Sequence, residues 1–269
     1  MNHLLRDLAP ISEKGWAAIE GEAKDRLTTH LAARRLVDFN GPHGWEHSVT
    51  DLGRVEAVSG PAAGVTARRR RVLPLVELRA TFEVSRAELD DAERGAENLD
   101  LAGLEEAAKA IALAENSAVF HGYTAAGIVG ITEAASHRPV ALERGVAGYP
   151  AVTARAVDAL RGAGIDGPYG LAIGPGGYTS IIETDEHGHL LLDHLRQILG
   201  GPVVWAPGIR GAVVMSMRGG DFVLDCGQDL SIGYLDHTAE TVRLYFEETI
   251  SFRVLEPDAA VALEDTPSA

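Results

Sequence analysis

The C-terminal part of the sequence contains a long stretch that alternates strictly between apolar and polar residues. The apolar residues share one parity, and only Glu248 interrupts them. They are Val242, Leu244, Phe246, Ile250, Phe252 and Val254. A period of two over this length predicts a half-buried β-strand, with one face in a core and the other face free. The segments that precede it, 219–222 and 228–234, are unlike the catalytic loop of an enzyme.

The composition is typical of a globular protein with one large domain or two modest ones. The 269 residues are 46% hydrophobic and 23% charged. The formal net charge of −15 argues against a dedicated nucleic-acid-binding protein, and the single Cys226 excludes an intramolecular disulfide or a cysteine-based zinc site. The sequence contains no apolar run of about 18 residues and no apolar signal-peptide stretch at its start, so we expect a soluble, cytoplasmic protein.

Helices and strands are interspersed without a βαβ rhythm, which predicts the α+β class. Apolar spacing predicts an amphipathic helix from residue 13 to about residue 36, with Ser12 as its N-cap. Asp100 is the expected N-cap of a long helix rich in small residues, which allow close packing against a sheet. A further helix is expected from Tyr149 to Arg161.

Two strand-like stretches, 49–59 and 70–85, predict an extended ribbon that reverses at 59–64. Such a ribbon is marginally stable alone, so it needs something to lie against, such as a neighbouring subunit. The only concentrated basic run is the four arginines of 68–71. In so acidic a chain, they favour a solvated strand tip that pairs with acidic groups across a subunit contact, rather than a nucleic-acid site.

The possible metal ligands are densest between residues 185 and 194. They are Asp185, Glu186, His187, His189, Asp193 and His194. These groups could hold zinc or iron, but a solvent-facing polar loop is commoner, and a symmetric ring of such loops would attract cations without a fixed ligand geometry. The glycine-rich segment 174–177 lacks the Lys-Ser/Thr of a nucleotide-binding loop, so we interpret it as a tight turn.

The sequence offers little catalytic chemistry. It contains no GxSxG motif, and no serine lies in a context that would activate it. Cys226 falls within a predicted strand, where a buried and inert thiol is the usual outcome. His30 and His121 are expected to pack or to cap helices. This scarcity favours a structural role.

Six blocks of the sequence, together with RLYFEETISF, resemble encapsulin shell proteins in their order and spacing. The blocks are NHLLRDLAPISEKGW, RRLVDFNGPHGWEH, PLVELRATFEVSRAELDDAERG, LEEAAKAIALAENSAVFHGY, GPYGLAIGPGGY and GGDFVLDCGQDLSIGY. The resemblance implies an α+β chain with the HK97 phage-capsid fold. The implied parts are an N-terminal helix or arm (1–47), an extended loop (48–84), a peripheral domain (85–139 and 216–269) with a spine helix from residue 101, and an axial domain (140–215).

By this resemblance, about sixty copies would close into an icosahedral shell built from pentamers. The shell would enclose a cargo enzyme, either a dye-decolourising peroxidase or a ferritin-like iron-storage protein, through the cargo's C-terminal targeting peptide. The residues at the family's peptide-binding positions are Arg34, Val37, Asp38, Leu230 and Ile232. Apolar anchors would enter a groove while Arg34 and Asp38 fix their orientation. An Arg34→Glu variant is then expected to give intact but empty shells.

The loop at 185–189 falls where members of that family narrow a five-fold pore. Five copies of Asp185, Glu186, His187, Gly188 and His189 would form a negatively biased, pH-sensitive ring, which suits the passage of ferrous iron or small polar substrates and does not require bound metal. No cofactor is expected, since segment 85–91 offers no aromatic residue for flavin. The expected partners are other copies and a cargo, without nucleic acid or membrane. The alternatives are a viral major capsid protein and a metal-dependent enzyme that uses 185–194.

Overall fold

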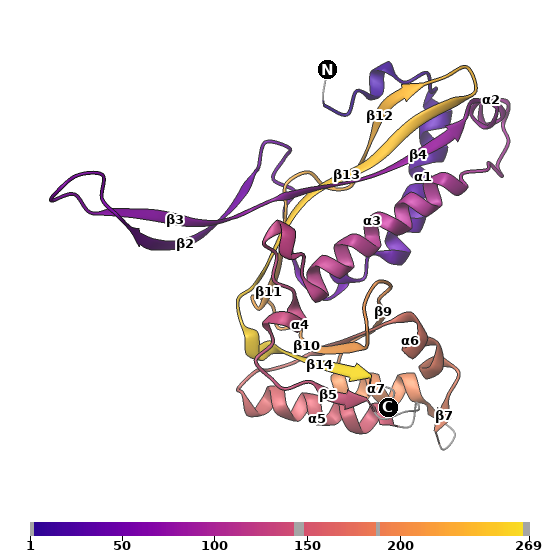
Figure 1. Cartoon of the computed structure of the whole chain (residues 1–269). Helices are drawn as coiled ribbons and strands as arrows, with labels where there is room; N and C mark the ends of the chain where they lie inside the picture. Colours follow the sequence, from indigo (N-terminus) through magenta and orange to yellow (C-terminus); the bar gives the residue numbers. More distant parts are fainter. Residues whose placement is uncertain (1–2, 143–147, 187–188, 266–269) are drawn as a thin grey trace.

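The fold of the chain comes from a computed structural model that describes residues 3–142, 148–186 and 189–265. Two five-stranded sheets lie in the two halves of an elongated molecule, and a two-stranded ribbon projects sideways from the first half (Figure 1). Helices and strands are interspersed, so the α+β prediction is confirmed.

The centre of the first sheet is β13 (Thr241–Val254). One edge of β13 pairs antiparallel with β4 (Val76–Ser85). Its other edge pairs first with β12 (Ser231–His237) and then with β11 (Phe222–Cys226). Finally β1 (Asp38–Asn40) adds to β11 in parallel. The predicted C-terminal strand is therefore confirmed as the longest strand of the described chain.

The expectation that β13 has one free face is wrong. Every residue from Leu244 to Phe252 is buried, on both faces of the strand. On the second face, the guanidinium of Arg79 lies 4.6 Å from the ring centre of Tyr245, and His3 Nε2 lies 3.1 Å from the carboxylate of Glu247. Side chains from the N-terminal segment and from the neighbouring strand β4 thus cover the face that the alternation in the sequence predicted to be free.

Three helices accompany the first sheet: α1 (Glu13–His30), α2 (Arg86–Arg94) and α3 (Ala102–His121). Helix α3 packs against β4 and β13, and α1 packs against α3. Ser12 caps α1 as predicted, because its Oγ accepts the N–H of Gly15 at 3.1 Å. The short 3-10 helix η1 (Arg6–Leu8) precedes α1.

Helix α1 ends earlier than residue 36, the expected end. The carboxamide Oδ1 of Asn116 accepts the N–H groups of Ala32 and Ala33, both at 3.0 Å, and its Nδ2 donates to the carbonyl of His30 at 2.8 Å. This fully buried side chain of α3 replaces the hydrogen bonds of a further helical turn. The chain then continues as the 3-10 helix η2 (Ala33–Arg35).

The second sheet has the strand order β5–β14–β10–β6–β9. These strands are β5 (Val140–Leu142), β14 (Ala260–Asp265), β10 (Ala212–Ser216), β6 (Tyr169–Ile173) and β9 (Val203–Trp205). Strand β14 falls outside the axial domain expected at 140–215, yet it lies in this sheet because it pairs with both β10 and β5.

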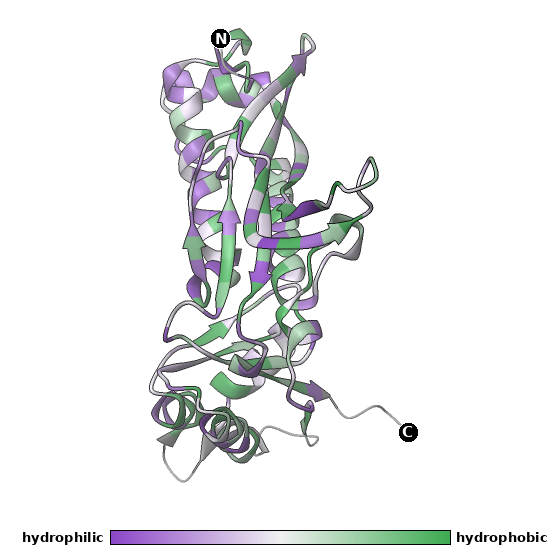
Figure 2. Cartoon of the chain, turned by 90° about the vertical axis from the view of Figure 1, so that its left-hand side faces the viewer, coloured by the Kyte–Doolittle hydropathy of each residue, from purple (hydrophilic) through white to green (hydrophobic). Residues whose placement is uncertain are grey.

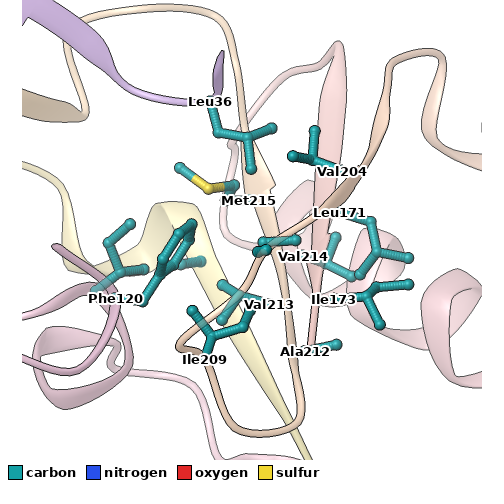
Figure 3. Close-up of a cluster of buried hydrophobic side chains, with 14 of the residues drawn as sticks. Leu36, Phe120, Leu171, Ile173, Val204, Ile209, Ala212, Val213, Val214 and Met215 are labelled. Atoms are coloured by element: carbon teal, nitrogen blue, oxygen red, sulfur yellow. The ribbon is translucent and has the colours of Figure 1, made fainter. Parts of the chain in front are cut away.

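Helices α5 and α7 pack against each other and cover the second sheet. The helices of this half are α4 (Ile131–Ala134), α5 (Tyr149–Gly162), α6 (Pro175–Ile182) and α7 (Leu191–Leu199), with the 3-10 helices η3 (Thr124–Ala126) and η5 (Pro257–Ala259). Figure 3 shows Leu171 and Ile173 of β6 beside Val214 and Ala212 of β10, their partners in the strand register, in the core of this half.

The ribbon is shorter than the expected 48–84. It consists of β2 (Val49–Val58) and β3 (Ala67–Pro74), which pair antiparallel. The chain then enters β4, where Phe82 and Val84 are buried and the strand pairs with β13 along ten residues, from Val76 to Ser85. The predicted second stretch, 70–85, therefore divides between the ribbon and the first sheet.

Segment 174–177 does not form a tight turn. Gly174 caps α6 in an extended conformation, and Pro175 begins the helix. Glycine is required at 177 by close packing, since a Cβ there would lie 2.5 Å from the Tyr149 hydroxyl. After α6, a two-stranded hairpin, β7 (Asp185–Glu186) and β8 (His189–Leu190), leads into α7.

Candidate binding groove

A groove of about 410 Å³ lies between helix α1 and the edge of the first sheet. Its apolar lining residues come from the N-terminal segment, α1, and β12 with its neighbours. They are Leu4, Ala23, Leu27, Leu31, Leu230, Ile232 and Phe246. The groove also has polar and charged lining residues, which are Arg6, Glu20, Lys24, Thr28, Arg34, Asp229 and Ser231. An apolar base with charged groups around it suits a peptide with apolar anchors.

The spacing of residues along α1 produces one wall of this groove. Ile19, Ala23 and Leu27 recur every four residues and are buried against the rest of the first half. Lys24 and Thr28 are adjacent to this stripe and remain exposed. The same helix therefore contributes both to the core and to the groove.

The opposite wall is the edge strand β12. Ile232 lies opposite Phe246 in register, so both side chains share the face that contacts the groove. At the outer edge of β12, the N–H of Tyr234 donates to the carbonyl of Leu4 at 2.8 Å. The N-terminal segment is further held by Arg6, whose guanidinium lies 4.1 Å from the ring centre of Trp16. This segment thus covers part of an edge that would otherwise be unpaired.

Arg34 lies at the inner end of the groove and binds three carboxylates. Its guanidinium donates to Glu115 at 2.6 Å, to Asp229 at 2.7 Å and to Glu248 at 2.9 Å. Glu115 and Glu248 have no exposed surface, whereas Asp229 is partly exposed in the groove. Burial opposes the positive charge of Arg34, but the three carboxylates outweigh it and raise the Arg34 pKa.

The two buried glutamates both have a raised pKa. Burial raises the pKa of Glu115, and burial together with the charge of Glu115 raises the pKa of Glu248 well above its ordinary value. Each carboxyl has one buried oxygen, Oε1, without a hydrogen-bond partner among the described residues. One guanidinium faces three carboxylates here, so the buried pair binds a proton more readily than two exposed glutamates would.

The structure brings together three of the five residues expected at the peptide site. Arg34, Leu230 and Ile232 line the groove. Val37 and Asp38 lie beside a separate cavity of about 110 Å³, which corrects the expectation of one common surface. The reason is that Asp38 begins β1, where its carboxylate accepts the N–H of Gly220 at 2.5 Å, while Val37 packs against the main core.

Sequence reasoning missed several residues of the groove. Leu4, Ala23, Leu27 and Phe246 contact it, although the periodicity of α1 and β13 predicted only core packing for three of them. The pairing of Leu4 with β12 had no signal in the sequence. These contributions come from tertiary contacts between segments that are distant in sequence.

Of the loop expected at a pore, His187 and Gly188 lie outside the described residues. The backbone of Asp185, Glu186 and His189 belongs to the β7–β8 hairpin, which connects α6 to α7 at the lower right of Figure 1. Asp193, the neighbouring candidate ligand, pairs with Arg196 at 3.3 Å. Residues 3–142, 148–186 and 189–265 contain no group of three or more His, Cys, Asp or Glu side chains arranged to hold a metal.

The remaining candidate residues have structural contacts. Cys226 is buried, and burial together with Asp229 raises the pKa of its thiol to about 12, in agreement with an inert thiol. His121 accepts the N–H of Arg210 at 3.0 Å, and His30 packs edge-on against Trp205. A cavity of about 650 Å³ near the start of α6 has His121, Arg210 and several glycines in its lining.

Among the described residues, no helix has the length and apolar character needed to cross a bilayer.

Comparison with known proteins identifies the family. A family model described as "Encapsulating protein for peroxidase" matches residues 1–251. A type 1 encapsulin shell protein of Rhodospirillum rubrum is 50% identical over 270 residues, which cover 98% of this chain and 96% of that protein. The chain belongs to the encapsulin shell proteins. Another member, from Mycolicibacterium paratuberculosis, is 45% identical and covers 98% of this chain and 99% of its own length.

Solved structures with the same fold are capsids and virus-like particles. The virus-like particle of Pyrococcus furiosus has a TM-score of 0.67 at 18% identity, over 93% of this chain and 99% of that one. The capsid of an empty GTA particle has a TM-score of 0.56 at 18% identity, over 88% and 90%. The encapsulin chain therefore has the HK97-like capsid fold, and it is a shell-forming subunit.

Proposed function

We propose that about sixty copies of this chain close into an icosahedral compartment that has no catalytic activity of its own. The observation that carries this proposal is the capsid-subunit fold with a ribbon that projects away from its own chain. The relatives are named as shell proteins, which supports a structural role. We propose the cytoplasm as its location.

The groove beside α1 is proposed to bind the C-terminal peptide of a cargo protein. Its apolar base offers pockets for apolar anchors, with Leu230 and Ile232 on one wall and Leu27 on the other. Lys24 and Asp229 present opposite charges at the groove and would fix the direction of a bound peptide. Arg34 acts through Asp229, because its guanidinium holds that carboxylate in place.

The proposed cargo is a dye-decolourising peroxidase or a ferritin-like iron-storage protein. The description of the matching family, which names peroxidase, supports the first of these. The proposed route for small substrates or iron is a five-fold ring of the loops at 185–189, whose acidic residues and histidines would favour cations. The loops need not bind a metal ion for this role.

Negative-stain electron microscopy of the purified chain, expressed alone, tests the assembly proposal. Uniform hollow spheres are expected. If the chain forms only small oligomers over a range of salt and pH, the proposal is overturned, and a metal-dependent enzyme centred on 185–194 becomes the better explanation. In that case the purified chain should contain stoichiometric bound metal and should be catalytically active without any cargo.

The docking proposal is tested with a fluorescent protein that carries the C-terminal tail of a dye-decolourising peroxidase. Leu230→Arg places a charge in the apolar part of the groove, so we expect shells that form normally but retain about tenfold less probe. Leu235→Arg is the matched control, because Leu235 lies on β12, which begins directly after Leu230, is 40% exposed and is outside the groove lining. Equal loading of the two variants would contradict the assignment of the groove.

A further inference from the structure

The first residues of the described chain cross the outer edge of β12 and the groove beside it. We call residues 3–8 the strap. Leu4 of the strap is 7% exposed and belongs to the apolar lining of the groove, together with Ile232 and Phe246. Figures 1 and 2 both place the start of the chain at the end of the first half that lies away from the second sheet, and Figure 2 shows hydrophobic and hydrophilic residues interspersed there. The strap therefore fills part of the space that the groove offers to a ligand.

The strap also uses the backbone of the outer edge of β12. In the antiparallel pair of β12 and β13, residues whose N–H and C=O face the partner strand alternate with residues whose N–H and C=O face outward. The N–H of Tyr234 faces outward and donates to the carbonyl of Leu4 at 2.8 Å. Ile232 has the same parity, so its N–H and C=O also face outward, beside the groove. Leu4 thus takes an apolar position and a backbone position that an extended peptide would use.

Leu5 holds the strap in a strained conformation. Its φ of 52° and ψ of 23° lie in the left-handed region, and among the described residues it is the only one besides glycines with a positive φ. This conformation is unfavourable for leucine, because the Cβ comes too close to the following carbonyl oxygen. Such strain persists only where surrounding contacts impose it, and it is typical of ligand clamps and switch regions. Release of the strap would relieve it.

The side-chain contacts of the strap lie near the surface. His3 Nε2 lies 3.1 Å from the carboxylate of Glu247, and the His3 ring stacks on Trp45 with the ring centres 4.4 Å apart. Arg6 pairs with Glu20 of α1, and the two side chains are 31% and 52% exposed. Exposed ion pairs contribute little to stability, so these contacts can separate while both sheets stay folded.

We propose that the strap is an internal competitor of the cargo peptide, which moves Leu4 out of the groove and adds as a strand to the outer edge of β12. The proposal rests on the proposed docking of a cargo tail in this groove and specifies how that site is regulated. An apolar side chain of the tail replaces that of Leu4, and the backbone of the tail bonds to Tyr234 and Ile232. Since the tail binds only to chains whose strap has left, the docked strap lowers the affinity for every tail by the same factor.

Truncation of Leu4 separates this proposal from the alternative that Leu4 is a fixed wall of the groove. Shells are reassembled with a dilution series of the fluorescent probe that carries the tail of a dye-decolourising peroxidase, and the probe concentration for half-loading is measured. Leu4→Ala weakens the docked strap, so half-loading should occur at an about tenfold lower probe concentration. A fixed wall would lose a contact with the tail, so a half-loading concentration that rises or stays the same overturns the proposal.

Leu8→Ala is the matched control for this change. Leu8 belongs to the same strap, is 50% exposed and is outside the groove lining. The control removes the same side chain from the same segment without freeing the groove, so it should load like the unchanged chain. Electron microscopy of each variant checks that its shells have formed normally.

Two substitutions of Leu5 test whether the strap has to leave. Leu5→Gly and Leu5→Ala both remove the side chain, but only glycine adopts a positive φ without strain. The strap of the glycine variant is therefore docked more firmly, and its shells should need about fivefold more probe for half-loading than those of the alanine variant. Equal half-loading of these two variants would contradict displacement of the strap.

Hydrogen exchange followed by mass spectrometry observes the strap directly in shells of the unchanged chain. Loaded shells should exchange the amides of residues 3–8 faster than empty shells, whereas unchanged or slower exchange there overturns the proposal. Failure of the proposed function would look different: unchanged shells would not retain the probe, or Leu230→Arg shells would retain it equally well. If the probe loads through the groove and Leu4→Ala does not improve loading, only the strap proposal fails.

Discussion

Glu248 is the residue that interrupts the alternation of apolar residues in β13. Its position is explained by contacts with residues that are distant in the sequence. It lies between Phe246 and Ile250, whose side chains belong to two separate clusters of the core. Its partners, Arg34 and Glu115, come from η2 and α3. The irregularity could be seen in the sequence, but the partners could not, because nothing local connects three segments so far apart in the chain.

Replacing Glu248 by Gln should stabilise the chain at neutral and alkaline pH by roughly 1–3 kcal/mol. The pKa of Glu248 is raised in the fold, so the folded chain binds more protons than the unfolded chain between the ordinary glutamate pKa and the folded value. Stability therefore falls as pH rises through that window. Glutamine does not titrate, and its amide can donate to the free oxygen of Glu115.

Urea unfolding midpoints measured from pH 5 to pH 9 check this prediction. The unchanged chain should lose stability as pH rises, and Glu248→Gln should have a flatter profile. Glu97→Gln, at an exposed position, is the control and should keep the original slope. Identical slopes in all three chains would contradict a raised pKa of Glu248 in the folded chain.

Arg34→Glu should prevent folding rather than produce empty shells, which revises the expectation from sequence. The change adds a carboxylate beside Glu115, Glu248 and Asp229 and removes the guanidinium that all three share, at a cost of about 3–5 kcal/mol. Arg35→Glu is the control, since Arg35 is exposed. Soluble yield and thermal unfolding of both variants provide the measurement, and a well-folded Arg34→Glu chain would disprove the structural role.

At the scale of elements, helices and strands with a strong period were predictable, whereas the C-terminal end of α1 and the end of the ribbon were not. Apolar spacing located α1, α3 and α5, because each buries one stripe of side chains. The end of α1 depends instead on Asn116 of α3, which is a tertiary contact. The second stretch of the expected ribbon likewise divides at Pro74, since only the residues after it pair with β13.

Asn116→Ala should lower the free energy of unfolding by about 3 kcal/mol. The change leaves the N–H groups of Ala32 and Ala33 and the carbonyls of His30 and Pro207 without their buried partner. Chemical denaturation measures the loss, with Asn98→Ala at an exposed loop position as the control. Equal stability of the two variants would show that α1 ends for another reason.

At the scale of the whole molecule, the resemblance of the chain to encapsulin shell proteins predicted the architecture and three of the residues that line the groove. The other groove residues are known only from the contacts between distant segments in the structure. Leu230 and Ile232 lie in the groove as expected because they flank the start of one strand. Val37 and Asp38 do not, because Asp38 begins β1 and Val37 packs against the main core; both line the smaller cavity, which Arg34 also borders. The pore residues remain a prediction.

Replacing the ribbon tip, residues 57–67, by a short glycine turn should leave the fold of the subunit intact and stop the assembly of shells. The reason is that the ribbon pairs only with itself among the described strands, so the two sheets do not depend on it. Circular dichroism should show an unchanged thermal transition, while electron microscopy should show no closed particles. Closed particles from this variant would mean that other surfaces suffice for assembly.

The strands β13 and β14 occupy interior positions in the two sheets, and both come from residues 241–265. During synthesis on the ribosome, neither half can complete its hydrogen-bonded sheet until this segment has emerged. A nascent chain therefore cannot present a finished subunit surface to other copies while most of it is still being made. The order of the strands in sequence delays association until residues 241–265 have been translated.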